Sequence, residues 1–436
     1  MSGSRVAPWL SNSRWGTVPI RLVARLGSGH TPSRSRPEYW EGCTIPWITL
    51  ADVWQLRRGE TNVITDTKEK ISPLGVANSA AVKHAAGTVI LSRTASVGFS
   101  AIMGREMATS QDFATWTCGP QLDRRYLLHA LRGMASDLKR IAMGSTHKTI
   151  YMPDIEQLRV PLPPLEEQRR IADFLDAEID RMADLSESLH RFDVDVRERE
   201  RAVLAQSLNA GARESESVLP DGWQWTPLMH LTDPLRQIMY GIVLPGPNVG
   251  DGVPIVKGGD VAANRLRVEA LNHTTREIEA GYARSRLKGG DLVIAIRGSV
   301  GEIAVVPQAL TGANLTQDAA RISVGKAVNA QWLRLALESP VVAHQIQGRV
   351  TGATIKGINI WDLKRILVPT PPAELQTVLA DGVGRSIQTH EALRVRVRQH
   401  KQLLAERRQA LITAAVTGQF DVSTASGRNV TEGITA

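Results

Sequence analysis

The chain has 436 residues, enough for two or three domains, and its 42% hydrophobic and 22% charged residues are typical of a globular protein. A formal charge of +8 permits a polyanionic partner without demonstrating one, because a solvated basic surface explains it equally well. Cys43 and Cys118 form neither a disulfide framework nor a paired metal motif, and neither a signal peptide nor an apolar run of ~20 residues is recognisable. These features predict a soluble cytoplasmic protein without membrane association.

The first part of the chain predicts strands and turns. The segment TVILSR (residues 88–93) is an apolar run that follows a glycine, as expected of a buried strand. Three polar loops border this region: SRTASVG (92–98), TSQD (109–112) and GSTHK (144–148). Arginine often reads guanine edges and glutamine adenine edges, while threonine and lysine hold phosphates. Taken singly, each loop is explained at least as well as a surface turn.

A long helix is predicted next. Pro163 and Pro164 are placed to begin it, since proline suits the first helical turn. Apolar residues then recur at steps of three and four, which predicts the seam of a coiled coil. That seam consists of Ile171, Leu175, Ile179, Met182, Leu185, Leu189, Phe192, Val196 and Val203. A helix of roughly 40 residues would be about 60 Å long, so a hairpin hidden inside one domain is the less favoured alternative.

The second half of the chain repeats the first. Pro163 and Pro371 are 208 residues apart, and so are Gln168 and Gln376. The offset falls to 203 at IRGSVG (296–301) and to 206 at LTQD (315–318), and it is again 208 at GATIK (352–356). Length changes of this kind are tolerated in surface loops and not in a packed core. The repeat therefore predicts a duplicated framework whose loops have diverged.

The second helix repeats the seam of the first, although glycines in DGVGRS (381–386) weaken its first turns. The predicted seam is Leu379, Val383, Ile387, His390, Leu393, Val397, His400, Leu404 and Leu411. We therefore expect an α+β fold, internally duplicated, in which two strand-rich domains are joined by two long antiparallel coiled-coil helices with pseudo-twofold symmetry. The expected parts are a first domain (1–158), a helical spacer (159–212), a second domain (213–366) and a second helix with a tail (367–436).

Recurrence of the polar loops in both halves favours a binding role for them. The candidate DNA-binding residues of the first domain are Arg93, Thr94, Ser96, Gln111, Thr146, His147 and Lys148. Those of the second domain are Arg297, Ser299, Gln317, Thr354 and Lys356. No phosphate loop, zinc motif or nucleophile elbow accompanies them, and GSGHTP (27–32) is interpreted as a turn. The sequence therefore predicts neither catalytic nor metal-binding residues.

Several segments together resemble the specificity subunits of type I restriction-modification enzymes. These are GSGHTPSRSRPEYWEGCTIPWI, ILSRTASVG, GSTHKTI, VPLPPLEEQRRIADFLDAEID and LPDGWQW. The resemblance covers almost the whole chain. The second half departs from the family pattern, with PPAELQ in place of PPLEEQ and no clear counterpart of GHTPS and PEYW. His147 stands where the family usually has an aliphatic residue.

The resemblance implies two target-recognition domains, each reading one half of a split double-stranded DNA sequence, in a subunit without catalysis of its own. The helices would dock two modification subunits, and we expect Leu165, Ile171, Leu175, Leu379 and Val383 to take part. S-adenosylmethionine would be bound by the modification subunits, and ATP with Mg²⁺ would serve the restriction endonuclease subunits. Two rivals stay open: a stand-alone nuclease or methyltransferase, and a protein-interaction scaffold, which would expose apolar loops instead of these polar ones.

Overall fold

The computed structural model describes residues 8–57, 61–144, 148–209, 219–262, 265–352 and 356–424. The chain divides into two compact units. The first comprises Met1–His190 and Arg398–Ala436, and the second comprises Arg191–Val397. Both long helices therefore contribute to each unit, whereas the domain boundaries predicted from the sequence assign each helix to a part of its own.

The first unit is built on a five-stranded sheet with the order β2-β9-β6-β7-β4. Its strands are β2 (Ala24–Ser28), β9 (Phe113–Cys118), β6 (Val89–Ser92), β7 (Ser100–Met103) and β4 (Val63–Ile64). A three-stranded sheet contains β5 (Glu69–Ile71), β3 (Ile45–Ile48) and β8 (Ala108–Thr109), and β1 (Thr17–Pro19) pairs with β10 (Arg159–Pro161). The strand predicted at 88–93 is β6, and all four of its residues are buried.

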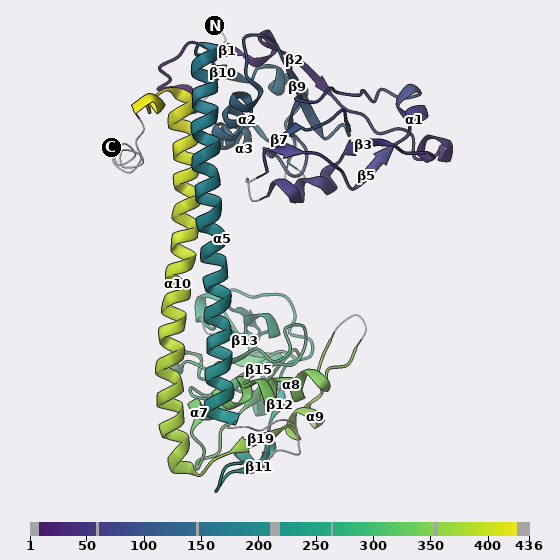
Figure 1. Ribbon diagram of the computed structural model, residues 1–436. Coiled ribbons are helices and arrows are strands. Elements are labelled where there is room, and N and C mark those ends of the chain that lie inside the picture. Colours follow the sequence, from purple (N-terminus) through teal and green to yellow (C-terminus); the bar gives the residue numbers. More distant parts are fainter. Residues whose placement is uncertain are drawn as a thin grey trace. The chain divides into compact units, whose positions relative to one another are not determined.

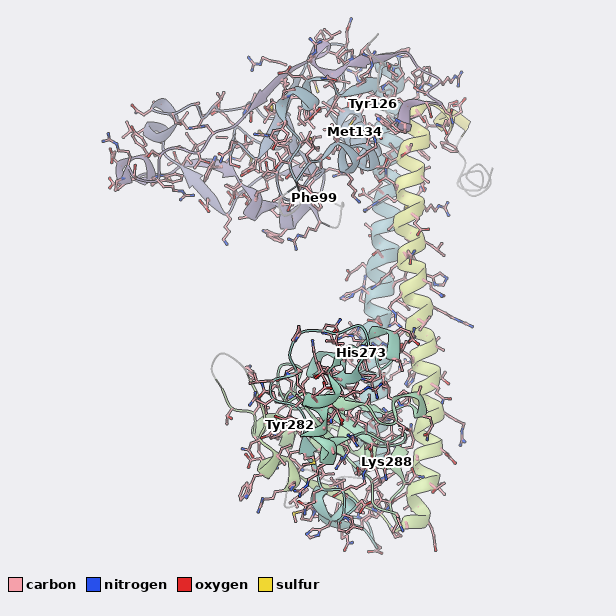
Figure 2. The ribbon with its side chains drawn as sticks, turned by 180° about the vertical axis from the view of Figure 1, so that it is seen from behind. Phe99, Tyr126, Met134, His273, Tyr282 and Lys288 are labelled. Carbon is pink, nitrogen blue, oxygen red and sulfur yellow. The ribbon has the colours of Figure 1, made fainter. Side chains whose placement is uncertain are left out.

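Helices cover this sheet and complete its core. They are α2 (Arg124–Gly133), α3 (Ala135–Ile141), α4 (Met152–Glu156) and parts of α5 (Leu165–Asn209) and α10 (Ala373–Thr417). The short helix α1 (Pro73–Ala77) packs instead in the cluster of the three-stranded sheet, through Val76. Asp123 caps α2 by accepting hydrogen bonds from the main-chain N–H groups of the first turn. The buried Tyr126 and Met134, both labelled in Figure 2, belong to the hydrophobic core of the first unit. The Tyr126 hydroxyl donates to the Pro161 and Val416 carbonyls, which links α2 to β10 and α10.

The second unit repeats the order of the first. Its main sheet is β12 (Met239–Tyr240), β18 (Ala319–Ile322), β15 (Leu292–Ala295) and β16 (Ile303–Val305). The smaller sheets are β14 (Asn272–Thr274), β13 (Val253–Val256) and β17 (Asn314–Leu315), and the pair β11 (Gln224–Pro227) and β19 (Leu367–Thr370). Its short helices are α6 (Arg276–Ala280), α7 (Ala330–Glu338), α8 (Pro340–Gly348) and α9 (Ile360–Lys364). Because strand order as well as sequence repeats, the predicted duplication is confirmed (Figure 1).

The long helices α5 and α10 have 45 residues each and begin 208 residues apart. The helix α10 runs through Gly382 and Gly384 without a break, so the weakness expected there is not observed. Within the first unit the N-terminal part of α5 packs on the C-terminal part of α10, and within the second unit the C-terminal part of α5 packs on the N-terminal part of α10. The pairing in each unit is therefore antiparallel, as predicted. In the part of the chain that the structure describes, no helix is long and apolar enough to cross a membrane.

The predicted seam of α5 is correct at Leu175, Ile179, Met182 and Val196, which are buried. It is wrong at Leu185 and Phe192, whose side chains are 50% and 42% exposed. Continuing the alternation of four and three from Met182 leads to Ser186 and Asp193 instead. Asp193 is charged, and it pairs with Arg394 of α10 at 3.5 Å and with Arg197 at 2.8 Å. A polar seam position of this kind specifies register at some loss of stability.

The repeated glutamine of the Pro-Pro motif has a structural role in both units. The Gln168 amide is fully buried, accepts from the Asp123 N–H at 2.9 Å and donates to the Gln121 and Pro163 carbonyls at 2.9 Å. Gln376 accepts from the Asn329 N–H at 2.9 Å and donates to the Pro371 carbonyl at 3.2 Å. Each glutamine thus fastens the long helix to the N-terminus of the short helix beneath it, which explains why the motif occurs twice.

Candidate nucleic-acid interface

Three loops that are far apart in the sequence meet in the first unit. The loop between β6 and β7 donates from the Arg93 N–H to the Asp112 carbonyl at 2.8 Å, next to Gln111. The same loop donates from the Ala95 N–H to the Lys148 carbonyl at 2.8 Å, and the Ile150 N–H donates back to the Arg93 carbonyl at 2.8 Å. The backbone therefore brings together the segments that carry Arg93, Gln111 and Lys148.

The second unit builds the same cluster with the same bonds. The Ile296 N–H donates to the Asp318 carbonyl at 2.9 Å, and the Gly298 N–H donates to the Lys356 carbonyl at 3.1 Å. The Ile358 N–H donates back to the Ile296 carbonyl at 2.9 Å. At one shared position the backbone is left-handed in both units, with φ of 56° at Ala95 and 74° at Gly298. The sites predicted from the repeat are thus structurally equivalent loops.

The two predicted arginines are not equivalent residues. The bonds above make Ile296 the counterpart of Arg93, and Arg297 is the counterpart of Thr94. Arg93 is half-buried and donates to the Ile150 carbonyl at 3.3 Å, while its Nε is buried without a hydrogen-bond partner in the described structure. Arg297 is exposed. The Arg93 side chain therefore helps to hold its own loop in place, whereas the side chain of Arg297 is exposed to solvent.

The remaining candidates differ in exposure. Gln111, Lys148, Arg297, Ser299 and Lys356 are exposed, whereas Thr94, Ser96 and Gln317 are half-buried. Gln111 accepts a hydrogen bond from the Thr31 hydroxyl at 2.6 Å, which orients its amide, and Ser299 donates to the Gly258 carbonyl at 3.4 Å. Thr146, His147 and Thr354 lie outside the described residues.

Sequence reasoning missed one part of the cluster, the GSGHTP segment. The strand β2 runs directly into it, and the His30 N–H donates to the Thr109 carbonyl at 3.0 Å. Gly29 is required there, because a Cβ at that position would lie 1.9 Å from the Thr109 oxygen. Gly241 has the same role against Leu315, where the distance would be 2.1 Å. The segment around Gly241 is thus the counterpart that the sequence of the second half did not reveal.

A network of charged side chains joins α2 to α5 in the first unit. Asp176 accepts from Arg125 at 3.1 Å, from Asn62 at 3.1 Å and contacts buried His129 at 2.8 Å. Burial lowers the pKa of His129 against the opposing effect of Asp176, and burial together with Arg408 lowers the pKa of Arg132 to about 10. The contacts of Asp176 with His129 and Arg125 therefore anchor α2 to α5, and this structural role is sufficient to explain the buried histidine. Over the described residues, no group of three or more metal-ligating side chains could hold an ion.

Three of the five docking residues predicted on the helices are core residues. Ile171, Leu175 and Val383 are buried in the cores of their own units, and Leu165 and Leu379 are half-buried. Buried core side chains cannot offer a surface to a partner, so Ile171, Leu175 and Val383 stabilise the fold. Exposed positions on the same helices, such as Val378 with 65% exposure, are the ones available for docking.

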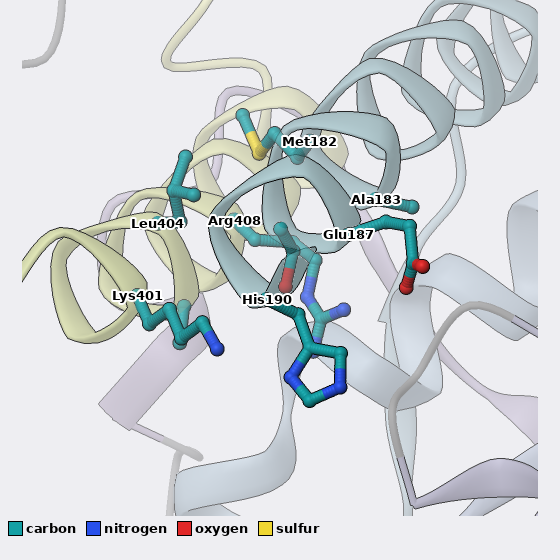
Figure 3. Close-up of a pocket in the computed structure, with 9 residues that line it drawn as sticks. Met182, Ala183, Glu187, His190, Lys401, Leu404 and Arg408 are labelled. Atoms are coloured by element: carbon teal, nitrogen blue, oxygen red, sulfur yellow. The ribbon is translucent and has the colours of Figure 1, made fainter. Parts of the chain in front are cut away.

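A groove of about 290 Å³ lies between α5 and α10 in the first unit. Figure 3 shows the apolar Met182 and Leu404 on one side and the basic ends of His190, Lys401 and Arg408 on the other. Glu187 lines the same groove. The groove combines an apolar wall with positive charge, a mixed surface that suits protein contact better than an apolar ligand.

The fold and its loops define a class of protein: a duplicated pair of α+β units that present polar loop clusters and are built on two shared helices. Residues 12–189 match the family model of the type I restriction modification DNA specificity domain. This match places a specificity domain of that family in the first unit.

The chain is also similar in sequence to several specificity subunits. The chain is 25% identical over 320 residues to the EcoBI specificity subunit of Escherichia coli, covering 68% of this chain and 66% of the relative. It is 31% identical to the MjaIX specificity subunit of Methanocaldococcus jannaschii, over 37% of each chain. The sequence matches to these two relatives thus span less than two thirds of their lengths.

Two solved structures share the fold at 19% identity. One belongs to a study of complex assembly and conformational transition of the type I R-M system, with a TM-score of 0.71 over 93% of this chain and 98% of that one. The other is the HsdS subunit of Thermoanaerobacter tengcongensis, with a TM-score of 0.50 over 93% of this chain and 97% of that one.

Proposed function

We propose that this chain recognises a split, asymmetric DNA sequence for a type I restriction-modification complex, with one unit reading each half. The observation that carries the proposal is that one loop cluster is built twice, with the same backbone hydrogen bonds and different side chains. Where the first unit has Arg93 and Thr94, the second has Ile296 and Arg297. Because side chains read base edges in DNA grooves, two such clusters suit two different half-sites.

The chemistry belongs to partner subunits in this proposal. Two modification subunits dock on exposed residues of α5 and α10, bind S-adenosylmethionine and methylate a flipped adenine. Restriction endonuclease subunits use ATP and Mg²⁺. The groove of the first unit, with Lys401 and His190 beside Met182 and Leu404, supports such docking because it offers apolar and charged contacts together. The complex acts on double-stranded DNA in the cytoplasm.

The deciding experiment maps methylated adenines in the genome by single-molecule sequencing. Cells that express the chain with its modification subunit are compared with cells that lack the chain. We expect a split motif that disappears with the chain. Exchanging residues 15–158 for the corresponding part of a relative should change one half of the motif only. A motif that changes in both halves, or no methylation that depends on the chain, contradicts the proposal.

Individual loop residues are tested against the same motif. Gln111→Ala should relax the preference at one base of one half-site, with a loss of ~1–3 kcal/mol of discrimination, because an oriented amide pairs bidentately with adenine. Lys148→Ala should weaken binding to all sequences alike if Lys148 holds a phosphate. A uniform loss with Gln111→Ala would instead place Gln111 at the backbone.

A further inference from the structure

We propose that the second unit carries a phosphate-binding pocket, separate from its loop cluster, that holds the DNA backbone beside the half-site. This inference rests on the proposed function and adds to it a contact that does not depend on base sequence. The pocket has a volume of about 800 Å³ and is lined by five basic residues. They are Arg236, Arg284, Arg286, Lys288 and Arg321. No lining residue is acidic, which makes an anion the favoured ligand.

The floor of the pocket is a buried arginine. Arg321 on β18 is only 2% exposed, and it donates to the carbonyls of Arg284 at 2.6 Å, Arg286 at 3.0 Å and Gln237 at 3.2 Å. Its Nε is buried without a hydrogen-bond partner in the described part of the chain. No carboxylate lies within ion-pair distance of this guanidinium among the described residues. Arg321 therefore fixes the backbone of the segment that lines the pocket, and only the longer-range fields of Asp291 and Asp233 oppose its charge.

Two further arginines are held rigidly by carboxylates behind the pocket. Arg236 donates to both Asp291 oxygens at 2.7 and 2.8 Å, and Arg286 donates to both Glu279 oxygens at 2.7 and 2.6 Å. These pairs neutralise two of the five positive charges and fix the walls. A site whose walls are fixed before the ligand arrives loses little entropy on binding.

The two remaining cations are free to bind. Arg284 and Lys288 are exposed, and within the described residues their side chains make no hydrogen bond or ion pair. Both belong to the segment that follows Tyr282, and Tyr282 and Lys288 are labelled in Figure 2. Arginine binds phosphate oxygens through paired N–H groups, and lysine binds them as a point charge. With Arg321 beneath them, these two side chains supply the donors that a phosphodiester needs.

The buried arginine of this pocket has no basic counterpart among the described residues of the first unit. By strand pairing, Thr115 takes the place of Arg321, because Thr115 pairs with Ile90 and Gly27 as Arg321 pairs with Val293 and Met239. The buried arginine is therefore a difference between the two units that the shared framework does not impose.

The position of the pocket on the sheet fits the DNA backbone. Arg321 lies in β18, and Gln317 of the loop cluster precedes this strand by two residues, so four residues of chain separate their Cα atoms by at most ~13 Å. The major groove of B-DNA is about 12 Å wide. If the base edges of a duplex lie at the Gln317 loop, one of its sugar-phosphate strands, at the edge of the major groove, would lie near the pocket.

The test removes the two free cations. Arg284→Ala with Lys288→Ala is compared with Arg267→Ala with Lys326→Ala, which removes two exposed charges of the same unit outside the pocket. The full chain, assembled with its modification subunit, is titrated with a duplex that contains the mapped motif and with one that lacks it, over a range of salt concentrations. Inorganic phosphate and pyrophosphate are titrated in parallel and followed by thermal shift.

We expect the pocket variant to lose roughly tenfold in affinity per contact on both duplexes. The slope of log K against log salt should become flatter by ~0.9 per contact, while the control keeps the wild-type slope. If the variant and the control bind alike, the pocket proposal fails although the proposed function stands. If the wild-type complex binds neither duplex, the proposed function fails as well. A thermal shift with phosphate that the variant loses, without any change in DNA binding, would assign the pocket to a free phosphate compound and overturn the backbone contact.

Discussion

Replacing Gln168 by leucine tests the role that the structure gives to the repeated Pro-Pro motif. The Gln168 amide is buried and makes three hydrogen bonds, one accepted from the Asp123 N–H and two donated to the Gln121 and Pro163 carbonyls. Leucine has a similar volume and makes none of them. The buried Asp123 N–H and two carbonyls would then lack partners in the folded state.

The expected loss follows from this count. A typical intramolecular hydrogen bond contributes about 1 kcal/mol net, and an unsatisfied buried group costs about 1–3 kcal/mol. Gln168→Leu should therefore destabilise the first unit by about 3 kcal/mol or more. Gln376→Leu removes two bonds in the second unit, to Asn329 and Pro371, and should cost about 2 kcal/mol. The matched control is Gln402→Leu, which changes an exposed residue of α10 whose side chain donates to Glu406 on the same helix.

Hydrogen exchange measured by mass spectrometry provides the assay, because the two units need not unfold together. Amides of residues 121–133 should exchange about a hundredfold faster in Gln168→Leu, since each 1.4 kcal/mol is a factor of ten. The second unit should keep its protection. Unchanged exchange in 121–133, or an equal effect from Gln402→Leu, would refute the view that this glutamine anchors the short helix.

Three other outcomes are expected. Gly29→Ala should cost the first unit about 3 kcal/mol in urea unfolding, since its Cβ would meet the Thr109 carbonyl, whereas Gly16→Ala, with open space around it, should be nearly neutral. Burial lowers the pKa of His129, so His129 in the unfolded chain takes up a proton below pH ~6.5 that the folded chain does not, and the first unit should lose stability as the pH falls. In His129→Gln the free energy of unfolding should depend less on pH, and an unchanged dependence would contradict this prediction. Burial raises the pKa of Cys118 to about 12, so its alkylation at pH 8 should be far slower than in the urea-unfolded chain, as peptide mass spectrometry can check.

The duplication and the long helices could be predicted from the sequence because their signals are periodic. A constant offset of 208 residues and apolar steps of three and four persist whatever the loops do. The seam prediction is wrong at Leu185 and Phe192 because it selects the nearest apolar residues. The alternating steps of four and three residues lead instead to Ser186 and to Asp193, which pairs with Arg394. Hydrophobicity alone does not show which face of a long helix is covered.

The loop clusters were predicted as separate loops, and their meeting depends on sheet order. Arg93 bonds to the Asp112 carbonyl because β6 pairs with both β7 and β9, an arrangement that no single segment encodes. The predicted equivalence of Arg93 and Arg297 is wrong because aligning the two motifs by identical residues does not align their backbone positions. The backbone hydrogen bonds pair Arg93 with Ile296 and Thr94 with Arg297. The basic pocket was missed for a related reason: its arginines are spread from residue 236 to residue 321 and come together only in the folded sheet.

The sharing of the long helices between the units has a consequence for synthesis on the ribosome. The core of the first unit includes Leu411, Ile412, Ala415 and Val416, which are made after the whole second unit. At ~5–20 residues per second, the first unit waits about 10–40 s for its last helix. The second unit, whose residues are contiguous, has no such delay. The unit that begins first therefore finishes last, and in the interval its exposed core surface around Leu175 and Tyr126 is a target for chaperones.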